Sequence, residues 1–135
     1  MDFRDELTIL AWTVVMEASG EPYEGKLAVA YVICTRAKRD GRTLFDVCLK
    51  PYQFSAWNTE SPTRMRLDDQ PQGVLRECYK AACSAYFQIE ADPTKGSTHY
   101  LNEEATRKLN GGKLPSWFRE SEVRARIGRH TFLVA

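Results

Sequence analysis

Two helical patterns separated by a short break occupy the N-terminal part of this 135-residue chain. Apolar residues recur at helical spacing from about Asp5 to Ala18, which predicts a helix with one buried stripe. Gly20 is placed to end that helix, and Pro22 is expected at the first position of a second helix that runs to about Lys38. The chain is therefore expected to begin as two helices joined by a tight turn.

Glu17 falls on the last turn of the first predicted helix, at the edge of its buried stripe. A carboxyl group there lies among apolar side chains and faces the negative end of the helix dipole, and both effects raise its pKa. A general acid that works near neutral pH needs such a raised pKa, so Glu17 is the candidate catalytic residue. From the residues alone, a solvated glutamate at a helix end is the alternative.

Glu21 lies just before the second predicted helix. An acid at the start of a helix satisfies its free amides, so a helix cap is the first interpretation of this residue. A second, stabilising carboxylate beside Glu17 is the other interpretation.

The rest of the chain changes from helical to extended patterns. Thr43 and Asp46 predict a capping box for a short helix at 44–49. Residues 52–70 show no period and predict a long loop, whereas residues 71–90 carry the strongest helical pattern, with Ile89 on its apolar face.

Beyond that helix, residues 97–101 and 130–134 predict short strands, with a turn at 110–112 between them. We therefore expect one α+β domain over residues 1–135: a mainly helical body at about 5–90 and a small β-containing part at about 95–135.

Composition excludes several classes of function. A formal net charge of +1 argues against a nucleic-acid binder that neutralises phosphates. No apolar run approaches the ~20 residues that cross a bilayer, so stable membrane insertion is not expected. The four cysteines form no Cys-x-x-Cys pair and only two histidines accompany them, so we expect reduced thiols and neither a metal nor another cofactor.

Two segments combine aromatic rings with amides and hydroxyls: residues 52–58 and 98–102. Such mixtures suit carbohydrate, although the first segment is equally consistent with a loop whose aromatic side chains fill the core. Alternation along 98–102 places His99 and Leu101 on one face, and Thr98, Tyr100 and Asn102 on the other. The candidate substrate-binding residues are Glu21, Tyr23, Gln53, Phe54, Ser55, Trp57, His99, Tyr100 and Asn102.

Four blocks of the sequence resemble, in the right order, the SleB/CwlJ-type cell wall hydrolases, the spore cortex-lytic family. Residues 17–30 resemble its E-A-x-G-E-P-x-x-G motif and the helix after it, where Thr35-Arg36 stands in place of Asn-Arg. Residues 53–55 resemble its Q-F-(S/T) segment, and 96–102 its G-A-T-H-Y-x-N strand. Trp117 and residues 127–132 resemble its closing W and I-G-x-H-x-F elements. The blocks cover nearly the whole chain.

This resemblance implies a single lysozyme-like catalytic domain that cuts peptidoglycan between N-acetylmuramic acid and N-acetylglucosamine, with Glu17 as the acid/base. Members that are lytic transglycosylases use one carboxylate and leave 1,6-anhydro-muramyl ends, which is the activity we expect for a monomer acting on glycan strands. Hydrolysis by a muramidase, an N-acetylmuramoyl-L-alanine amidase and a non-catalytic glycan-binding module are the alternatives.

The N-terminus predicts where the protein is made. Met1 to Glu6 are polar and acidic, unlike a secretory signal, and no wall-binding segment is evident. The chain in this respect resembles a bacteriophage endolysin, so we expect synthesis in the host cytoplasm and action on the cell wall after release.

Overall fold

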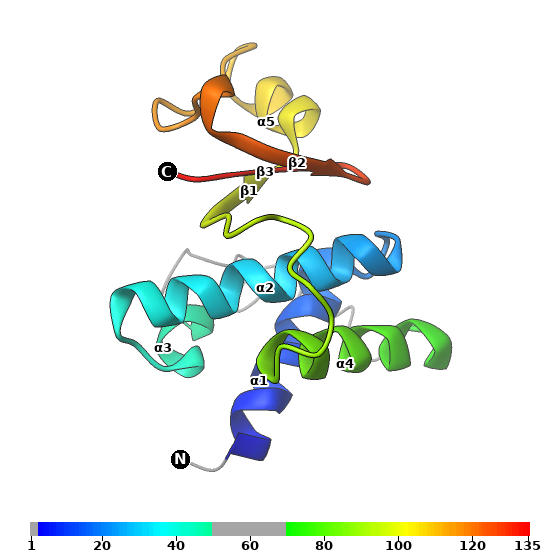
Figure 1. Cartoon of the computed structure of the whole chain (residues 1–135). Helices are drawn as coiled ribbons and strands as arrows, with labels where there is room; N and C mark the ends of the chain where they lie inside the picture. The colour runs from blue at the N-terminus through cyan, green and yellow to red at the C-terminus, as the bar shows by residue number, and fades with distance from the viewer. Residues whose placement is uncertain (1–2, 50–69) are drawn as a thin grey trace.

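Four helices form the lower body in the view of Figure 1, and a small sheet lies above them. The computed structural model describes residues 3–49 and 70–135. The helices are α1 (Phe3–Ala18), α2 (Tyr23–Asp40), α3 (Leu44–Leu49) and α4 (Gln72–Tyr86). Helix α2 packs against both α1 and α4 and separates α4 from the sheet (Figure 1). The predicted mainly helical fold with a small C-terminal β region is confirmed.

Residues with characteristic capping properties lie at the ends of the helices. Pro22 is the N-cap of α2, not its first helical residue as predicted, with extended φ and ψ of −61° and 163°. Gly41 ends α2 in the left-handed conformation that glycine tolerates best, with φ of 62°. At α3 the predicted cap is present, because the Asp46 amide donates a 3.1 Å hydrogen bond to Thr43 Oγ1.

Helix α4 ends four residues earlier than predicted. Gln88 adopts a left-handed backbone with φ of 55°, and the Ile89 amide returns to the Ser84 carbonyl oxygen at 2.8 Å. The chain has therefore left the helix before Ile89, whose side chain is 72% exposed instead of lying on an apolar face. The apolar spacing in the sequence continues beyond Tyr86, whereas the backbone conformation ends the helix there.

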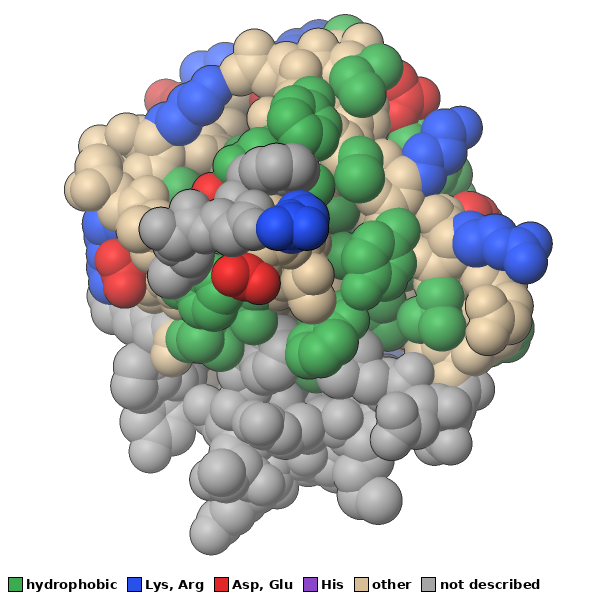
Figure 2. Space-filling view, turned by 90° about the horizontal axis from the view of Figure 1, so that it is seen from below, with side chains coloured by type: hydrophobic (Ala, Val, Ile, Leu, Met, Phe, Trp, Pro, Cys, Tyr) green, Lys and Arg blue, Asp and Glu red, His purple; other side chains and the backbone are tan. Residues whose placement is uncertain are grey.

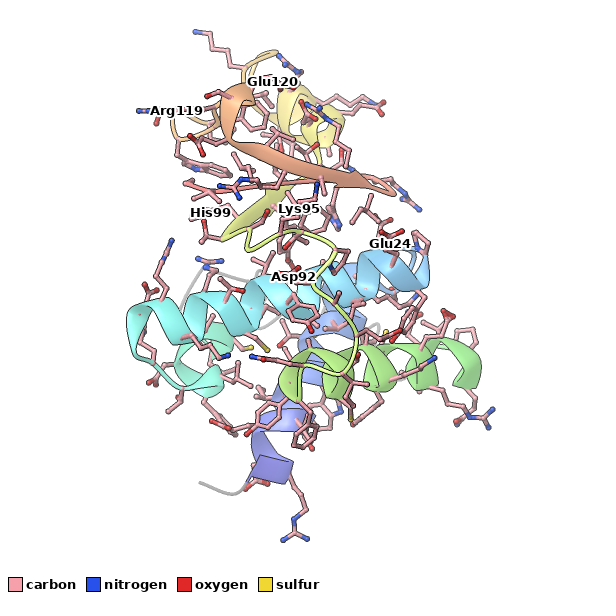
Figure 3. The ribbon with its side chains drawn as sticks, in the orientation of Figure 1. Glu24, Asp92, Lys95, His99, Arg119 and Glu120 are labelled. Carbon is pink, nitrogen blue, oxygen red and sulfur yellow. The ribbon has the colours of Figure 1, made fainter. Side chains whose placement is uncertain are left out.

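A linker carries the chain from α4 over α2 to the sheet, and Asp92 shapes its turn (Figure 3). The Asp92 carboxylate accepts hydrogen bonds from the amide and hydroxyl of Thr94 and from the Gly96 amide, at 2.7–3.0 Å. These bonds satisfy the polar groups of a sharp bend, and the next residues enter the first strand.

Three antiparallel strands form the sheet in the order β1-β3-β2. They are β1 (His99–Leu101), β2 (Val123–Ile127) and β3 (His130–Leu133), and Tyr100 pairs with Phe132. The strands predicted near 97–101 and 130–134 are confirmed. Two further elements, α5 (Glu103–Leu109) and β2, were not foreseen, and a 3-10 turn, η3 (Glu120–Glu122), precedes β2.

One cluster of buried side chains joins the helices to the sheet. Its fully buried members on α1 and α2 include Leu10, Val14, Val29 and Val32, and Phe132 of β3 extends it upward. The four cysteines are free thiols. Among the described residues, no helix is both long and apolar enough to cross a membrane.

The lower face of the helical body carries a gathering of hydrophobic side chains (Figure 2). Large hydrophobic side chains of the helical body with partial exposure include Trp12 of α1 and Tyr79 of α4. Trp12 Nε1 donates a 3.0 Å hydrogen bond to Tyr79 Oη, which ties these two helices together.

Candidate active site

Glu17 lies on the last turn of α1, where the helix meets the turn into α2. The Ser19 amide still bonds to the Val15 carbonyl oxygen, and the Glu21 amide bonds to that of Ala18, so the backbone around Glu17 is fixed. Its side chain is only partly exposed, and its neighbours Met16 and Ala18 are buried. The predicted position at the edge of the buried stripe is confirmed.

Tyr100 of β1 reaches this carboxyl group from the sheet. Tyr100 Oη donates a hydrogen bond to Glu17 Oε1 at 2.6 Å. Burial raises the pKa of Glu17, and the hydrogen bond from Tyr100 opposes that rise by favouring the ionised form. Burial and the neighbouring carboxylate raise the pKa of Tyr100 well above its usual value, so the phenol keeps its proton. The site therefore holds a carboxyl group adjusted toward the acid form.

Glu17 opens into a cavity of about 330 Å³ at the junction of helices and sheet. Two carboxyl groups, an imidazole and a guanidinium line it, which gives it a strongly polar wall. Its lining residues are Met16, Glu17, Ala18, Ser19, Gly20, Glu21, Asn102, Arg129 and His130.

Glu21 supplies the second carboxylate, and its role differs from the predicted helix cap. Pro22 caps α2 without a side-chain hydrogen bond, whereas the Glu21 carboxylate turns to the sheet. The Arg129 amide donates a 2.8 Å hydrogen bond to Glu21 Oε1. The buried Lys26 ammonium donates to the Glu21 carbonyl oxygen, which fixes the backbone of this residue. Glu21 thus joins the α1–α2 turn to the β2–β3 turn.

His130 and Arg129 belong to the cavity but were not predicted as site residues. The His130 ring packs edge-on against Tyr100, with centroids 4.9 Å apart. Burial lowers the pKa of His130, so its neutral form is favoured. The I-G-x-H-x-F block did single out His130, but sequence spacing gives no sign that it meets Glu21, more than 100 residues away.

The other sequence candidates divide into three groups. Asn102 lines the cavity, and its Oδ1 also accepts a 2.9 Å hydrogen bond from the Ala105 amide at the start of α5. His99, labelled in Figure 3, and Tyr23 lie outside the lining. The His99 ring lies 5.0 Å from the Trp117 ring at a tilt of 47°, and Tyr23 Oη donates a hydrogen bond to Glu90. The remaining candidates, Gln53, Phe54, Ser55 and Trp57, lie outside the described residues.

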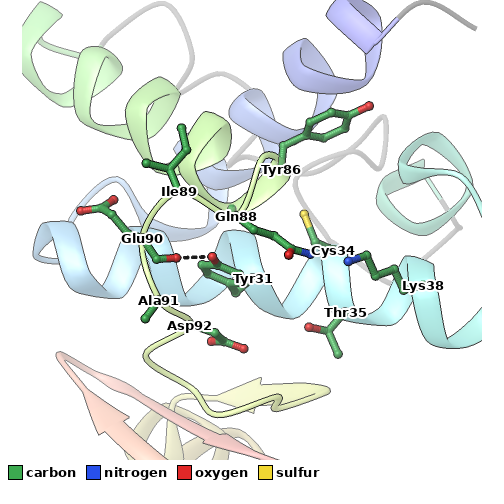
Figure 4. A pocket seen from close by; sticks show the side chains of 11 residues that line it. Tyr31, Cys34, Thr35, Lys38, Tyr86, Gln88, Ile89, Glu90, Ala91 and Asp92 are labelled. Carbon is green, nitrogen blue, oxygen red and sulfur yellow. Dashed lines mark hydrogen bonds between the residues drawn. The ribbon is translucent and has the colours of Figure 1, made fainter.

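A larger cavity of about 550 Å³ lies between α2 and the segment after α4 (Figure 4). Tyr31 Oη donates a hydrogen bond to the Glu90 carbonyl oxygen across it. Burial raises the pKa of the Cys34 thiol to about 12, so this thiol is a poor nucleophile. The hydrogen bond from Tyr23 lowers the pKa of Glu90 and keeps it ionised. The Glu17 cavity is therefore the better candidate for acid–base chemistry.

A carboxyl group with a raised pKa in a polar cavity is a candidate site for acid–base catalysis. The family model described as Cell Wall Hydrolase matches residues 20–133. The chain therefore belongs to the cell wall hydrolase family, a family of enzymes, and Glu17 lies three residues before the first matched residue.

Named relatives agree with this assignment. The chain is 27% identical over 130 residues to the spore cortex-lytic enzyme of Bacillus subtilis (strain 168); the match covers 95% of the chain and 37% of that protein. The chain thus spans just over a third of the relative's length.

Two solved structures are also similar. The catalytic domain of the Bacillus cereus SleB protein superposes with a TM-score of 0.71 at 25% identity, covering 96% of this chain and 90% of that one. The catalytic domain of the germination-specific lytic transglycosylase SleB from Bacillus anthracis gives 0.66 at 24% identity, covering 96% and 94%. The second likeness shows the fold alone.

Proposed function

We propose that this chain is a peptidoglycan-degrading glycosidase that cleaves the β-1,4 bond between N-acetylmuramic acid and N-acetylglucosamine as a lytic transglycosylase. The observation that carries the proposal is the Glu17 carboxyl group, which is kept toward its acid form by burial and opens into a polar cavity. The names of the relatives support it, since one is a spore cortex-lytic enzyme and another a lytic transglycosylase.

One carboxyl group completes this reaction. Protonated Glu17 gives its proton to the glycosidic oxygen as the bond from that oxygen to muramyl C1 breaks. The resulting carboxylate takes the proton of the muramyl 6-hydroxyl as O6 bonds to C1, which closes the 1,6-anhydro ring. Glu17 ends protonated again, and no water is consumed. Tyr100 supports both stages, because its hydrogen bond stabilises the carboxylate that forms between them.

The contacts of the Glu21 carboxylate favour this reaction over hydrolysis by a muramidase. Hydrolysis needs a second group that activates water or attacks C1. Glu21 Oε1 already accepts the Arg129 amide, and Oε2 lies 3.6 Å from Arg129 Nε. A carboxylate held in this way is poorly placed to act as a free base.

The test is mass spectrometry of the muropeptides that the protein releases from purified peptidoglycan. Anhydro-muramyl ends that disappear in a Glu17→Gln variant would support both the reaction and the residue. Reducing-end muramic acid would instead mean hydrolysis, and cut stem peptides would mean an amidase. Action as a phage lysis protein stays a prediction.

A further inference from the structure

The Glu21 carboxylate occupies a place that two glycines keep open. The Glu21 side chain is only 6% exposed, yet it bears a carboxylate, which is costly to bury without partners. Gly128 has φ of +57°, and a Cβ atom there would lie 2.6 Å from Glu21 Oε1. A Cβ atom on Gly25 would lie 3.0 Å from Glu21 Cβ on the other side. With the Arg129 amide bound to Oε1, the carboxylate has a defined position on the cavity wall.

His130 presents one ring nitrogen to this carboxylate. His130 Nδ1 lies 3.5 Å from Glu21 Oε1 and is buried, with no hydrogen-bond partner among the residues the structure describes. The rings of Tyr100 and Phe132 flank the imidazole at 4.9 and 6.0 Å, both edge-on, and hold its orientation. The Arg129 amide thus positions the Glu21 carboxylate, and the two aromatic rings position the His130 imidazole beside it.

The charge of Glu21 decides where the His130 proton resides. A lone pair on Nδ1 would face the carboxylate oxygen and be repelled, whereas an Nδ1–H group is attracted to it. Neutral imidazole with its proton on Nδ1 carries its acceptor lone pair on Nε2. Among the described residues, Nδ1 is a buried side-chain atom without a hydrogen-bond partner, whereas Nε2 is not. His130 also lines the cavity that Glu17 opens into.

We propose that Glu21 and His130 form a carboxylate–imidazole pair in which Glu21 holds the proton on Nδ1, so that His130 Nε2 accepts a hydrogen bond from the glycan. The donor would be a sugar hydroxyl or an acetamido N–H of the unit bound beside Glu17. His130 is then a substrate-contacting residue, and Glu21 is a positioning residue that acts through it. The identity of the ligand rests on the proposed function, whereas the position of the proton does not.

The position of the proton is tested on the protein alone by ¹⁵N and ¹³C NMR of its histidine rings. The chain has two histidines, so His99→Gln leaves one signal set that belongs to His130. We expect neutral imidazole protonated on Nδ1 at pH 7. Glu21→Gln removes the charge and is expected to lower the fraction of that form. Imidazolium, or a proton on Nε2, in the protein with Glu21 intact would overturn the pairing.

Contact with the glycan is tested by three variants of His130 on purified peptidoglycan. Gln places its amide near the Nε2 position, Asn places it near Nδ1, and Phe keeps the ring without a nitrogen. We expect His130→Asn and His130→Phe to release muropeptides roughly 10-fold more slowly, and His130→Gln to retain more of the rate. Thermal melting of each variant separates this effect from loss of folding.

Two outcomes distinguish a failure of the proposed His130–glycan contact from a failure of the proposed function. If the protein cleaves through Glu17 but His130→Asn and His130→Phe, both folded, keep the full rate, the contact with the glycan is wrong. If the protein and its Glu17→Gln variant release the same products, the proposed function is wrong, and the NMR result still decides whether the Glu21–His130 pair exists.

Discussion

Two opposing effects act on Glu17, and their balance decides when it can donate a proton. Burial raises its pKa, while the hydrogen bond from Tyr100 Oη favours the carboxylate. An acid that gives up its proton and later recovers it needs both effects, because neither form should be strongly favoured over the other. The sequence predicted the position of Glu17 at a helix end, whereas Tyr100 becomes its partner only through the packing of β1 on the helices.

The pH dependence of activity tests this balance at the level of one hydrogen bond. Tyr100→Phe removes the donor that stabilises the Glu17 carboxylate, so the pKa of Glu17 should rise further above its ordinary value. The acid form then persists to higher pH, and the basic limb of the rate profile should move to higher pH. Rates of muropeptide release across a pH series would show this, and a limb that stays in place or moves to lower pH would contradict it.

At the scale of elements, the four helices of the body were predictable, whereas α5 was not and the small sheet was predictable only in part. The patterns at 5–18 and 44–49 gave α1 and α3 because their apolar faces and caps are local signals. Helix α5 has no buried residue and hence no apolar period to detect. Strand β2 alternates Val, Ala and Ile with two arginines, a usable signal weakened by its one small residue. The contact of the β2–β3 turn with Glu21 depends on tertiary packing and leaves no local pattern.

The β2–β3 turn should tolerate no side chain at Gly128. Gly128→Ala introduces both a left-handed backbone penalty and a Cβ atom 2.6 Å from Glu21 Oε1. The matched control is Gly111→Ala, since Gly111 has φ of +59° and open space around it. We expect about 1–2 kcal/mol of lost stability for Gly111→Ala from the backbone alone, and clearly more for Gly128→Ala. Urea unfolding measures both, and equal losses would mean that the Glu21 contact is unimportant.

At the scale of the whole molecule, one buried cluster connects the helical body to the sheet and so keeps Glu17 and Tyr100 together. Phe132 of β3 is fully buried in this cluster, and its strand partner is Tyr100. Stability and the geometry of the site are therefore coupled: a change that loosens the sheet also removes the partner of Glu17.

Phe132→Ala tests that coupling. Loss of a fully buried phenylalanine is expected to cost about 3–5 kcal/mol of unfolding free energy. Leu109→Ala is the control, since Leu109 is 90% exposed and its loss should change stability by no more than about 0.5 kcal/mol. Thermal or urea unfolding compares the two variants. A Phe132→Ala protein as stable as the Leu109→Ala protein would show that the sheet is not held by this core.

Mass spectrometry of released muropeptides would show whether Glu17 is the acid and base of a glycan-cleaving reaction. Purified peptidoglycan is treated with the protein or with its Glu17→Gln variant, whose near-identical shape and unchanged melting temperature would show that folding is intact. We predict 1,6-anhydro-muramyl products from the protein and a rate at least about 100-fold lower from the variant. The same products at the same rate from both proteins would show that Glu17 does not carry the reaction.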